Sequence, residues 1–156
     1  MSTNSSDDTQ SSALISAFFV HDALFGLDTS RVQEVIRPGV ITKVHHASEE
    51  VLGIINLRGR IVTIIDLGLK LSLGKLTLTG ESRVYIVEDQ NEFVGLLVDR
   101  VSDAIEVPRA SLLPPPPNVK GVQGKFFEGV HQNGGNLIAV LKTSEILSLK
   151  NRHPLV

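Results

Sequence analysis

The sequence predicts a mainly β protein built as two small barrels of about five strands each, with a few short helices. From residue 13 onward, short runs rich in valine and isoleucine alternate with turn residues, a composition typical of β-strands. Several of these runs occur in pairs around short polar turns, which predicts hairpins. A chain of 156 residues suits one domain or two lobes that share a core. Closing each sheet into a barrel would hide its edge strands from solvent.

The first half of the chain reads as strands joined by short turns. Residues 21–23 separate two apolar runs, and Gly59 allows a tight turn between two more. Good helix N-caps at residues 28–30 and at Asp66 predict short helical pieces after them. The predicted elements are strands at 14–20 and 24–27, helical turns at 31–35, a strand at 40–44, a helical start at 48–51, strands at 53–57 and 61–65, and a short helix at 67–71.

After a loop at 73–82, the second half again alternates apolar runs with polar turns, although the sequence shows no convincing repeat of residues. Polar residues at 89–91 and 133–135 mark two hairpin turns, and four prolines at 114–117 exclude helix and central strand there. Thr143 and Ser144 would cap a C-terminal helix. The predicted elements are strands at 83–88 and 92–98, a helical turn at 99–103, strands at 104–107, 126–131 and 137–141, and a helix at 145–149.

The ends of the chain and its apolar content set expectations for location. Residues 1–13 are almost entirely small and polar, so we expect a disordered tail before a single domain at 14–156. The start has neither the basic residues nor the apolar core of a secretory signal. No apolar run approaches the roughly 20 residues that cross a bilayer. We therefore expect a cytoplasmic protein.

Charge and composition argue against several classes of function. The 15 Lys and Arg against 17 Asp and Glu give a net charge of −2, which leaves no surplus positive charge to neutralise phosphates or an anionic membrane surface. The chain has no Trp and one Tyr, so stacking platforms for nucleic-acid bases are scarce. It has no cysteine, which excludes disulfides, thiolate metal sites and a cysteine nucleophile.

The sequence offers little for catalysis or metal binding. His45 and His46 are adjacent, and neighbours on a strand point to opposite faces, so no shared metal is expected. Asp66 and Asp99 each end an apolar run. Two carboxylates could serve as general acid and base of a small hydrolase, but we favour the simpler reading that each caps the turn that follows.

The segment from Asn56 to Gly59 is the one polar motif between strongly apolar strands. Asn56 and Arg58 could satisfy carbonyl groups of the turn, or Arg58 could project its five donors toward a carboxylate of a partner. The spacing alone does not decide between these two roles.

Three stretches of the chain together resemble the CheW-like family of chemotaxis coupling proteins. The likeness runs from about residue 14 to 149, in the order of the family and with similar spacing. The stretches are Gly26-Leu27-Asp28 followed by Val32-Gln33-Glu34-Val35; Gly53-x-x-Asn56-Leu57-Arg58-Gly59-x-Ile61-Val62-x-Ile64-Ile65-Asp66-Leu67; and Val94-Gly95-Leu96-Leu97-Val98-Asp99-x-Val101-Ser102-Asp103.

The resemblance implies two five-stranded SH3-like barrel lobes packed on a shared core, with no enzymatic activity and no cofactor. It implies two partners, the cytoplasmic tip of a chemoreceptor and the regulatory domain of a CheA-type histidine kinase. It also implies sites. The receptor-binding groove between the lobes would be lined by Val32, Glu34, Arg58, Val101 and Ala104. Kinase binding would lie near Gly53 and Ile61, and Asn56, Leu57 and Gly59 would support the central motif.

One stretch departs from the family. From Leu112 to Asn118, including Leu113, the chain lacks the arginine and the aromatic residue that some relatives use for a second kinase contact. The resemblance therefore carries no prediction of that second contact. It also leaves open which signalling pathway the chain would serve.

Three other functions remain as alternatives. A CheW-like protein of a non-flagellar pathway would have the same fold and another receptor. A barrel that binds oligonucleotides or oligosaccharides fits the fold class, but the low aromatic content and the net negative charge count against it. A hydrolase would need the carboxylates of Asp66 and Asp99 together in one pocket.

Overall fold

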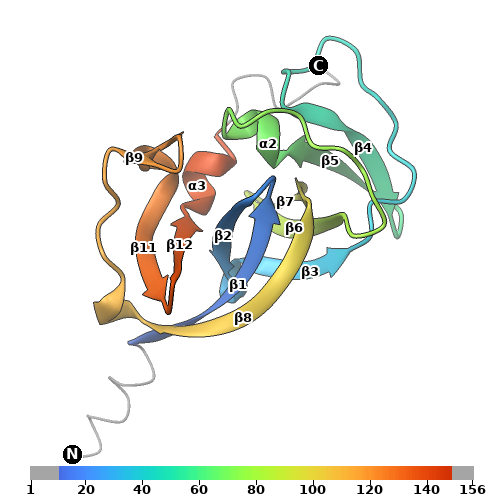
Figure 1. Ribbon diagram of the computed structural model, residues 1–156. Helices are drawn as coiled ribbons and strands as arrows, with labels where there is room; N and C mark the ends of the chain where they lie inside the picture. Colours follow the sequence, from blue (N-terminus) through green and yellow to red (C-terminus); the bar gives the residue numbers. More distant parts are fainter. Residues whose placement is uncertain (1–10, 149–156) are drawn as a thin grey trace, which may run out of the picture.

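The computed structural model describes residues 11–148, and these form two five-stranded sheets (Figure 1). Residues 1–10 of the predicted tail at 1–13 and the last residues, including Leu149 of the predicted final helix, lie outside the described range. Sheet A has the strand order β11-β12-β2-β1-β8. Its strands are β1 (Ser12–Val20), β2 (Ala23–Asp28), β8 (Arg100–Pro108), β11 (Phe127–Asn133) and β12 (Asn136–Leu141).

Sheet B has the strand order β3-β6-β7-β5-β4. Its strands are β3 (Val32–Ile36), β4 (Val51–Leu57), β5 (Arg60–Asp66), β6 (Arg83–Asp89) and β7 (Glu92–Val98). The remaining elements are short: η1 (Thr29–Arg31), α2 (Leu67–Lys70), η2 (Arg109–Ser111), the small pair β9 (Asn118–Val119) and β10 (Val122–Gln123), η3 (Gly124–Phe126) and α3 (Thr143–Ile146). The mainly β class and the two sets of five strands are confirmed.

All four predicted hairpins form: β1–β2, β4–β5, β6–β7 and β11–β12. Asp66 caps α2, since its Oδ1 accepts a hydrogen bond from Leu69 N at 3.1 Å. The run of prolines at 114–117 lies outside every helix and strand, as expected. β1 begins at Ser12, two residues before the predicted start of the domain.

Two predicted helical turns are wrong because strand pairing overrides the local capping signal. Asp28 does cap a turn, but η1 ends at Arg31, and 32–36 form β3, which pairs with β6. In the same way, 99–103 are not helical, because β8 begins at Arg100 and pairs with β1. Pairing of β-branched residues with a neighbouring strand decides both segments.

Three smaller predictions also fail. Residues 40–44 are not a strand: only Thr42 forms an isolated bridge, to Ile54, and Val40 is 87% exposed. Residues 48–51 form one turn, closed by Val51 N donating to Ser48 O, and not a helix. The final helix begins at Thr143 after Lys142, so Thr143 and Ser144 lie inside it and do not cap it.

Each half of the chain contributes strands to both sheets. The first half supplies β1 and β2 to sheet A and β3, β4 and β5 to sheet B, while the second supplies β6 and β7 to sheet B and β8, β11 and β12 to sheet A. Figure 1 shows β8 as a long curved strand that leaves the end of β7 and follows β1. Only Asp99 separates β7 from β8, so the crossing between sheets is short.

Isolated bridges connect the two edges of each sheet. Thr42, which follows edge strand β3, pairs with Ile54 on edge strand β4. Leu113, which follows edge strand β8, pairs with Val130 on edge strand β11. These bridges bring opposite edges toward each other, and closure into SH3-like barrels stays a prediction.

One apolar cluster includes residues of both sheets. Strand β6 is buried on both faces, because Val84, Tyr85, Ile86 and Val87 are all 0% exposed. Val84 and Ile86 lie over Gly95, where an added Cβ would come within 2.6 Å of Val84 Cγ1. Alternation along the strand turns Tyr85 and Val87 toward the other face, which meets sheet A. The core is therefore shared between the sheets.

Candidate functional site

The two sheets meet where β1 faces β6. The hydroxyl groups of Ser16 and Tyr85 lie 2.6 Å apart and form a hydrogen bond, and the rings of Phe18 and Tyr85 are 5.0 Å apart between centroids. Tyr85 is fully buried, and this burial raises the pKa of its hydroxyl, an effect that the hydrogen bond with Ser16 partly opposes. The contact fixes one face of β1 against one face of β6.

Strands β3 and β8 pair with the two strands of this contact, β3 with β6 and β8 with β1. On β3, Val35 is paired with Tyr85 and Val32 with Val87. Directly paired residues project from the same face of a sheet, so these two valines lie beside the contact between the sheets. Val35 is 41% exposed and Val32 is half-buried.

On β8, the pairing places the corresponding residues beside β1. Ala104 is paired with Ser16, and Val101 with Phe18. Val101 is 42% exposed and Ala104 is exposed. Leu14, two residues before Ser16 on the same face of β1, is 49% exposed. We call this apolar surface the inter-sheet strip; its members are Leu14, Val32, Val35, Val101 and Ala104.

Two predicted groove residues, Glu34 and Arg58, form an ion pair on the other face of β3, since Glu34 is paired with Ile86. Arg58 lies at the tip of the β4–β5 hairpin, and its Nη2 donates a hydrogen bond to Oε2 of Glu34 on β3. The arginine side chain is 68% exposed, so the pair contributes little to stability. Its remaining N–H donors are free to reach outward. Arg58 therefore stands next to the strand that carries Val32 and Val35.

The turn around Arg58 explains the supporting residues of the motif. Arg58 and Gly59 both have positive φ, 49° and 85°. Asn56 Oδ1 accepts a hydrogen bond from Gly59 N at 2.8 Å, which holds this turn. Leu57 is half-buried and pairs with Arg60 across the hairpin. Asn56 thus has the turn-stabilising role, while Arg58 points away from the turn toward Glu34.

The two residues predicted near the kinase contact differ in exposure. Ile61 on β5 is 55% exposed. Gly53 is buried, and a Cβ there would collide with the carbonyl oxygen of Thr42. The absence of a side chain lets the Thr42 segment form its bridge with Ile54. Gly53 itself therefore shapes the edge of sheet B, and Ile61 offers the surface there.

The carboxylates considered for catalysis are occupied by backbone donors. Asp66 is fully buried, and its Oδ2 accepts from Leu76 N at 3.0 Å, in addition to the cap on α2. Asp99 Oδ2 accepts from His21 N at 2.5 Å. His45 and His46 are exposed in a turn, and among residues 11–148 no group of three His, Cys, Asp or Glu is placed to hold a metal ion. The capping role is confirmed for Asp66.

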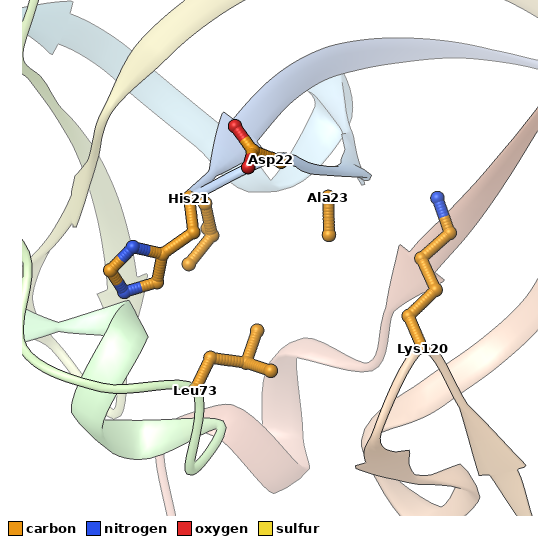
Figure 2. Close-up of a pocket in the computed structure, with 6 residues that line it drawn as sticks. His21, Asp22, Ala23, Leu73 and Lys120 are labelled. Carbon is orange, nitrogen blue, oxygen red and sulfur yellow. The ribbon is translucent and has the colours of Figure 1, made fainter.

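An open hollow of 420 Å³ lies beside the tip of the β1–β2 hairpin (Figure 2). It is lined by Val20, His21, Asp22, Ala23, Leu73 and Lys120. Lys120 Nζ donates to Leu137 O at 2.7 Å and to Leu24 O at 3.3 Å, so the ammonium group bonds to backbone carbonyls near the starts of β12 and β2. Burial lowers the pKa of Lys120, and likewise that of Lys70.

A model of the CheW-like domain family matches residues 15–151. The chain belongs to this family. The match covers both sheets, and the fold and the central hairpin motif agree with it. None of the helices within residues 11–148 has the length and apolar character needed to cross a membrane.

Individual relatives carry the same family name. The chemotaxis protein CheW of Rhizobium meliloti (strain 1021) is 29% identical over 136 residues, covering 87% of this chain and 88% of the relative. Protein FrzA of Myxococcus xanthus is 28% identical over 123 residues, covering 79% and 76%. The crystal structure of the scaffolding protein TtCheW from Thermoanaerobacter tengcongensis superposes with a TM-score of 0.82 and 34% identity, over 89% of this chain and 90% of that one.

The structure brings Val32, Val101 and Ala104 to the contact between the sheets, whereas Glu34, which pairs with Ile86, projects from the other face of β3, where it bonds with Arg58. The structure adds Leu14 and Val35, which the sequence did not indicate, because single apolar residues within strands read as core. A signal for the second wall exists in the sequence: Arg31-Val32-Gln33-Glu34 and Arg100-Val101-Ser102-Asp103 share the pattern Arg-Val-polar-acidic. The two segments begin β3 and β8.

Proposed function

We propose that this chain is a non-catalytic adaptor that couples the cytoplasmic tips of chemoreceptors to the regulatory domain of a CheA-type histidine kinase. The family match and the likeness to a scaffolding protein support this role. The observation that carries it is the inter-sheet strip, an exposed apolar surface whose strand β3 carries an ion pair on its other face. Exposed apolar patches rimmed by polar residues are typical of protein–protein contacts.

The chemistry of the strip suits a helical partner. An amphipathic helix lays its apolar face on such a surface and is read by residues one turn apart. Val32, Val101 and Ala104 supply apolar contact, and we add Leu14 and Val35 to this set. Glu34 and Arg58 would set orientation and partner choice more than affinity. We assign the strip and this pair to the receptor.

The kinase would bind elsewhere, so that both partners are held at once. Ile61, exposed on the edge of sheet B, supports a contact on the β4–β5 hairpin, with Gly53 shaping the edge beneath it. The two lobes would act as one domain over residues 14–156, in the cytoplasm with its partners. A coupling protein of a non-flagellar pathway has the same chemistry and differs in which receptor and kinase are captured.

The deciding experiment measures receptor binding of Arg58→Glu by co-sedimentation with receptor-containing membranes. Reversing the charge removes the exposed donors and places a carboxylate beside Glu34, so we expect affinity to fall at least about tenfold, or about 1.4 kcal/mol. Binding to the isolated kinase regulatory domain should be unchanged, because Arg58 is not assigned to that contact.

The matched control is Arg109→Glu, since Arg109 is also an exposed arginine in an ion pair, with Asp28 at 3.5 Å. It should retain receptor binding and the same melting temperature as Arg58→Glu. Unchanged receptor binding of Arg58→Glu, or an equal loss in both variants, would contradict the assignment of Arg58 to the receptor site.

A further inference from the structure

His21, at the tip of the β1–β2 hairpin, bonds to two segments next to sheet B. The residue has a positive φ of 53°, as tight hairpin turns require. Its backbone N–H donates to Asp99 Oδ2 at 2.5 Å, and Asp99 N donates in return to Phe19 O at 2.9 Å. Asp99 is the residue at which the chain crosses from β7 to β8. The hairpin tip is therefore bonded to the crossing point between the sheets.

The imidazole of His21 makes a second connection. Its Nε2 lies 2.8 Å from Gly74 O, and because a carbonyl oxygen only accepts, Nε2 must carry the proton. Figure 2 shows the ring pointing away from Lys120, on the side of the loop that carries Leu73. The ring thus reaches from sheet A to the loop that follows α2.

That loop is fixed to the end of β5. Leu73 N donates to Gly68 O at 2.7 Å, and Leu76 N donates to the buried Oδ2 of Asp66 at 3.0 Å. Asp66 is the last residue of β5, whose other end begins next to Arg58. Hydrogen bonds and the short backbone segments between them therefore connect Asp99, before β8, with Asp66 at the end of β5.

We infer that His21 is a positioning residue that fixes the relative placement of sheets A and B and thereby the spacing across the inter-sheet strip. Val101 follows Asp99 by two residues on β8, so holding Asp99 holds one wall of the strip. The loop that carries Gly74 joins α2 to β6 of sheet B, and β3 of the same sheet supplies the other wall. That this spacing matters for binding rests on the proposed receptor function. That His21 sets the spacing does not rest on that function.

The variant that tests this is His21→Asn. Asparagine tolerates positive φ, so the turn and its N–H to Asp99 are retained while the ring contact with Gly74 is lost. The matched control is Gln90→Asn, at the tip of the β6–β7 hairpin, where φ is 52° and the side chain is also exposed. His21→Gln, which keeps a side-chain N–H donor, should restore part of the contact.

The measurement is the distribution of distances between spin labels at Val35→Cys and Val101→Cys, one on each wall of the strip. The chain has no native cysteine, so the labels are unambiguous. We expect His21→Asn to broaden this distribution, Gln90→Asn to leave it unchanged, and His21→Gln to fall between. A label pair within sheet B, at Val35→Cys and Ile61→Cys, should not change in any variant.

A second measurement, of amide hydrogen exchange, uses the chain without spin labels. Amide exchange of Leu76, which lies in the loop that the ring contacts and whose N–H bonds to Asp66, should be at least about tenfold faster in His21→Asn than in Gln90→Asn. Equal distance distributions and equal exchange in the two variants would overturn the inference. Because neither measurement uses a partner, that failure is distinct from a failure of receptor binding. A broadened strip with undiminished receptor affinity would overturn the functional part of the inference alone.

Discussion

The two halves of the chain, from β1 to α2 and from β6 to α3, build the same main elements in the same order, and the second half adds the β9–β10 pair. Each begins with a hairpin in one sheet, crosses to the other sheet as an edge strand, adds a second hairpin there and ends in a short helix. In both halves a strand of the second hairpin pairs in parallel with the first hairpin of the other half, β5 with β7 and β12 with β2. The two sheets are therefore assembled by exchange between halves.

Residues at equivalent positions confirm this correspondence. Ser16 and Tyr85, which bond to each other, are paired with Ala104 and Val35 on the two edge strands. Gly26 and Gly95 are each paired in parallel with an apolar residue of the other half. Each half thus supplies one wall of the inter-sheet strip.

The halves differ in the side chains at matching turns. The register makes Asp66 and Lys142 equivalent, and both precede a short helix, but only Asp66 caps it with its side chain. The β4–β5 tip carries Arg58, whereas the β11–β12 tip is Gly134-Gly135. The repeated features are those that the fold requires, and the charged residue assigned to binding is present in one half only.

The largest expected effect comes from Asp66→Ala. The substitution removes the cap on α2 and leaves Leu76 N without its buried acceptor. A lost cap costs about 1 kcal/mol and an unsatisfied buried N–H about 2, so the free energy of unfolding should fall by about 3 kcal/mol. Urea unfolding of Lys142→Ala, its equivalent, should show a change of less than about 0.5 kcal/mol. Similar losses in both variants would break the distinction between the two caps.

The next effect concerns the paired glycines. A Cβ at Gly95 would lie 2.6 Å from both Ile64 Cδ1 and Val84 Cγ1, so Gly95→Ala should destabilise the chain by about 2 kcal/mol. At Gly26, a Cβ would lie 2.5 Å from Ile15 Cγ2 and 3.2 Å from Ile138 Cγ2. Gly26→Ala should therefore also destabilise, by about 1 kcal/mol or more.

Thermal melting of the two variants checks this comparison. Adding Ile64→Val to Gly95→Ala removes the Cδ1 methyl and should recover part of the loss. If Gly95→Ala melted at the temperature of the unsubstituted chain, the close packing over β7 would be refuted, and with it the equivalence of the two glycines.

Local signals predicted the hairpins well, but they missed edge strand β3 and the start of edge strand β8. The turns at residues 21–23 and at Gly59 are set by nearby residues, so the sequence shows them. The helical assignments at β3 and β8 failed because capping residues there are followed by β-branched side chains that pair with distant strands. The exchange between halves rests on pairings far apart in sequence, which no local pattern encodes.

Local sequence signals likewise indicated some residues of the candidate site and not others. Asn56, Arg58 and Gly59 stood out in the sequence as a polar turn, whereas Val32, Val101 and Ala104 entered through the family resemblance. Leu14 and Val35 could not be told from core residues, since alternation is the same for a face that meets another sheet and for one that meets a partner. Exposure at the junction of two sheets is a property of the assembled fold alone.

The smallest expected effect tests the bond between the equivalent residues Ser16 and Tyr85. Burial raises the pKa of Tyr85 above its ordinary value near 10, so the folded state keeps the hydroxyl protonated. The contribution of the protonated Tyr85 hydroxyl to stability is complete below about pH 10 and is lost as the pH rises through the raised pKa.

Tyr85→Phe should cost about 1 kcal/mol of stability at pH 8, and this difference from the unsubstituted chain should shrink above pH 10. Because Tyr85 is the one tyrosine of the chain, its absorbance reports this titration directly. Ser16→Ala removes the hydrogen-bond partner but leaves the titrating tyrosine, so this variant should still lose stability at alkaline pH. If Tyr85→Phe instead unfolded at the same alkaline pH as the unsubstituted chain, the contact between the two halves would not exclude the ionised hydroxyl.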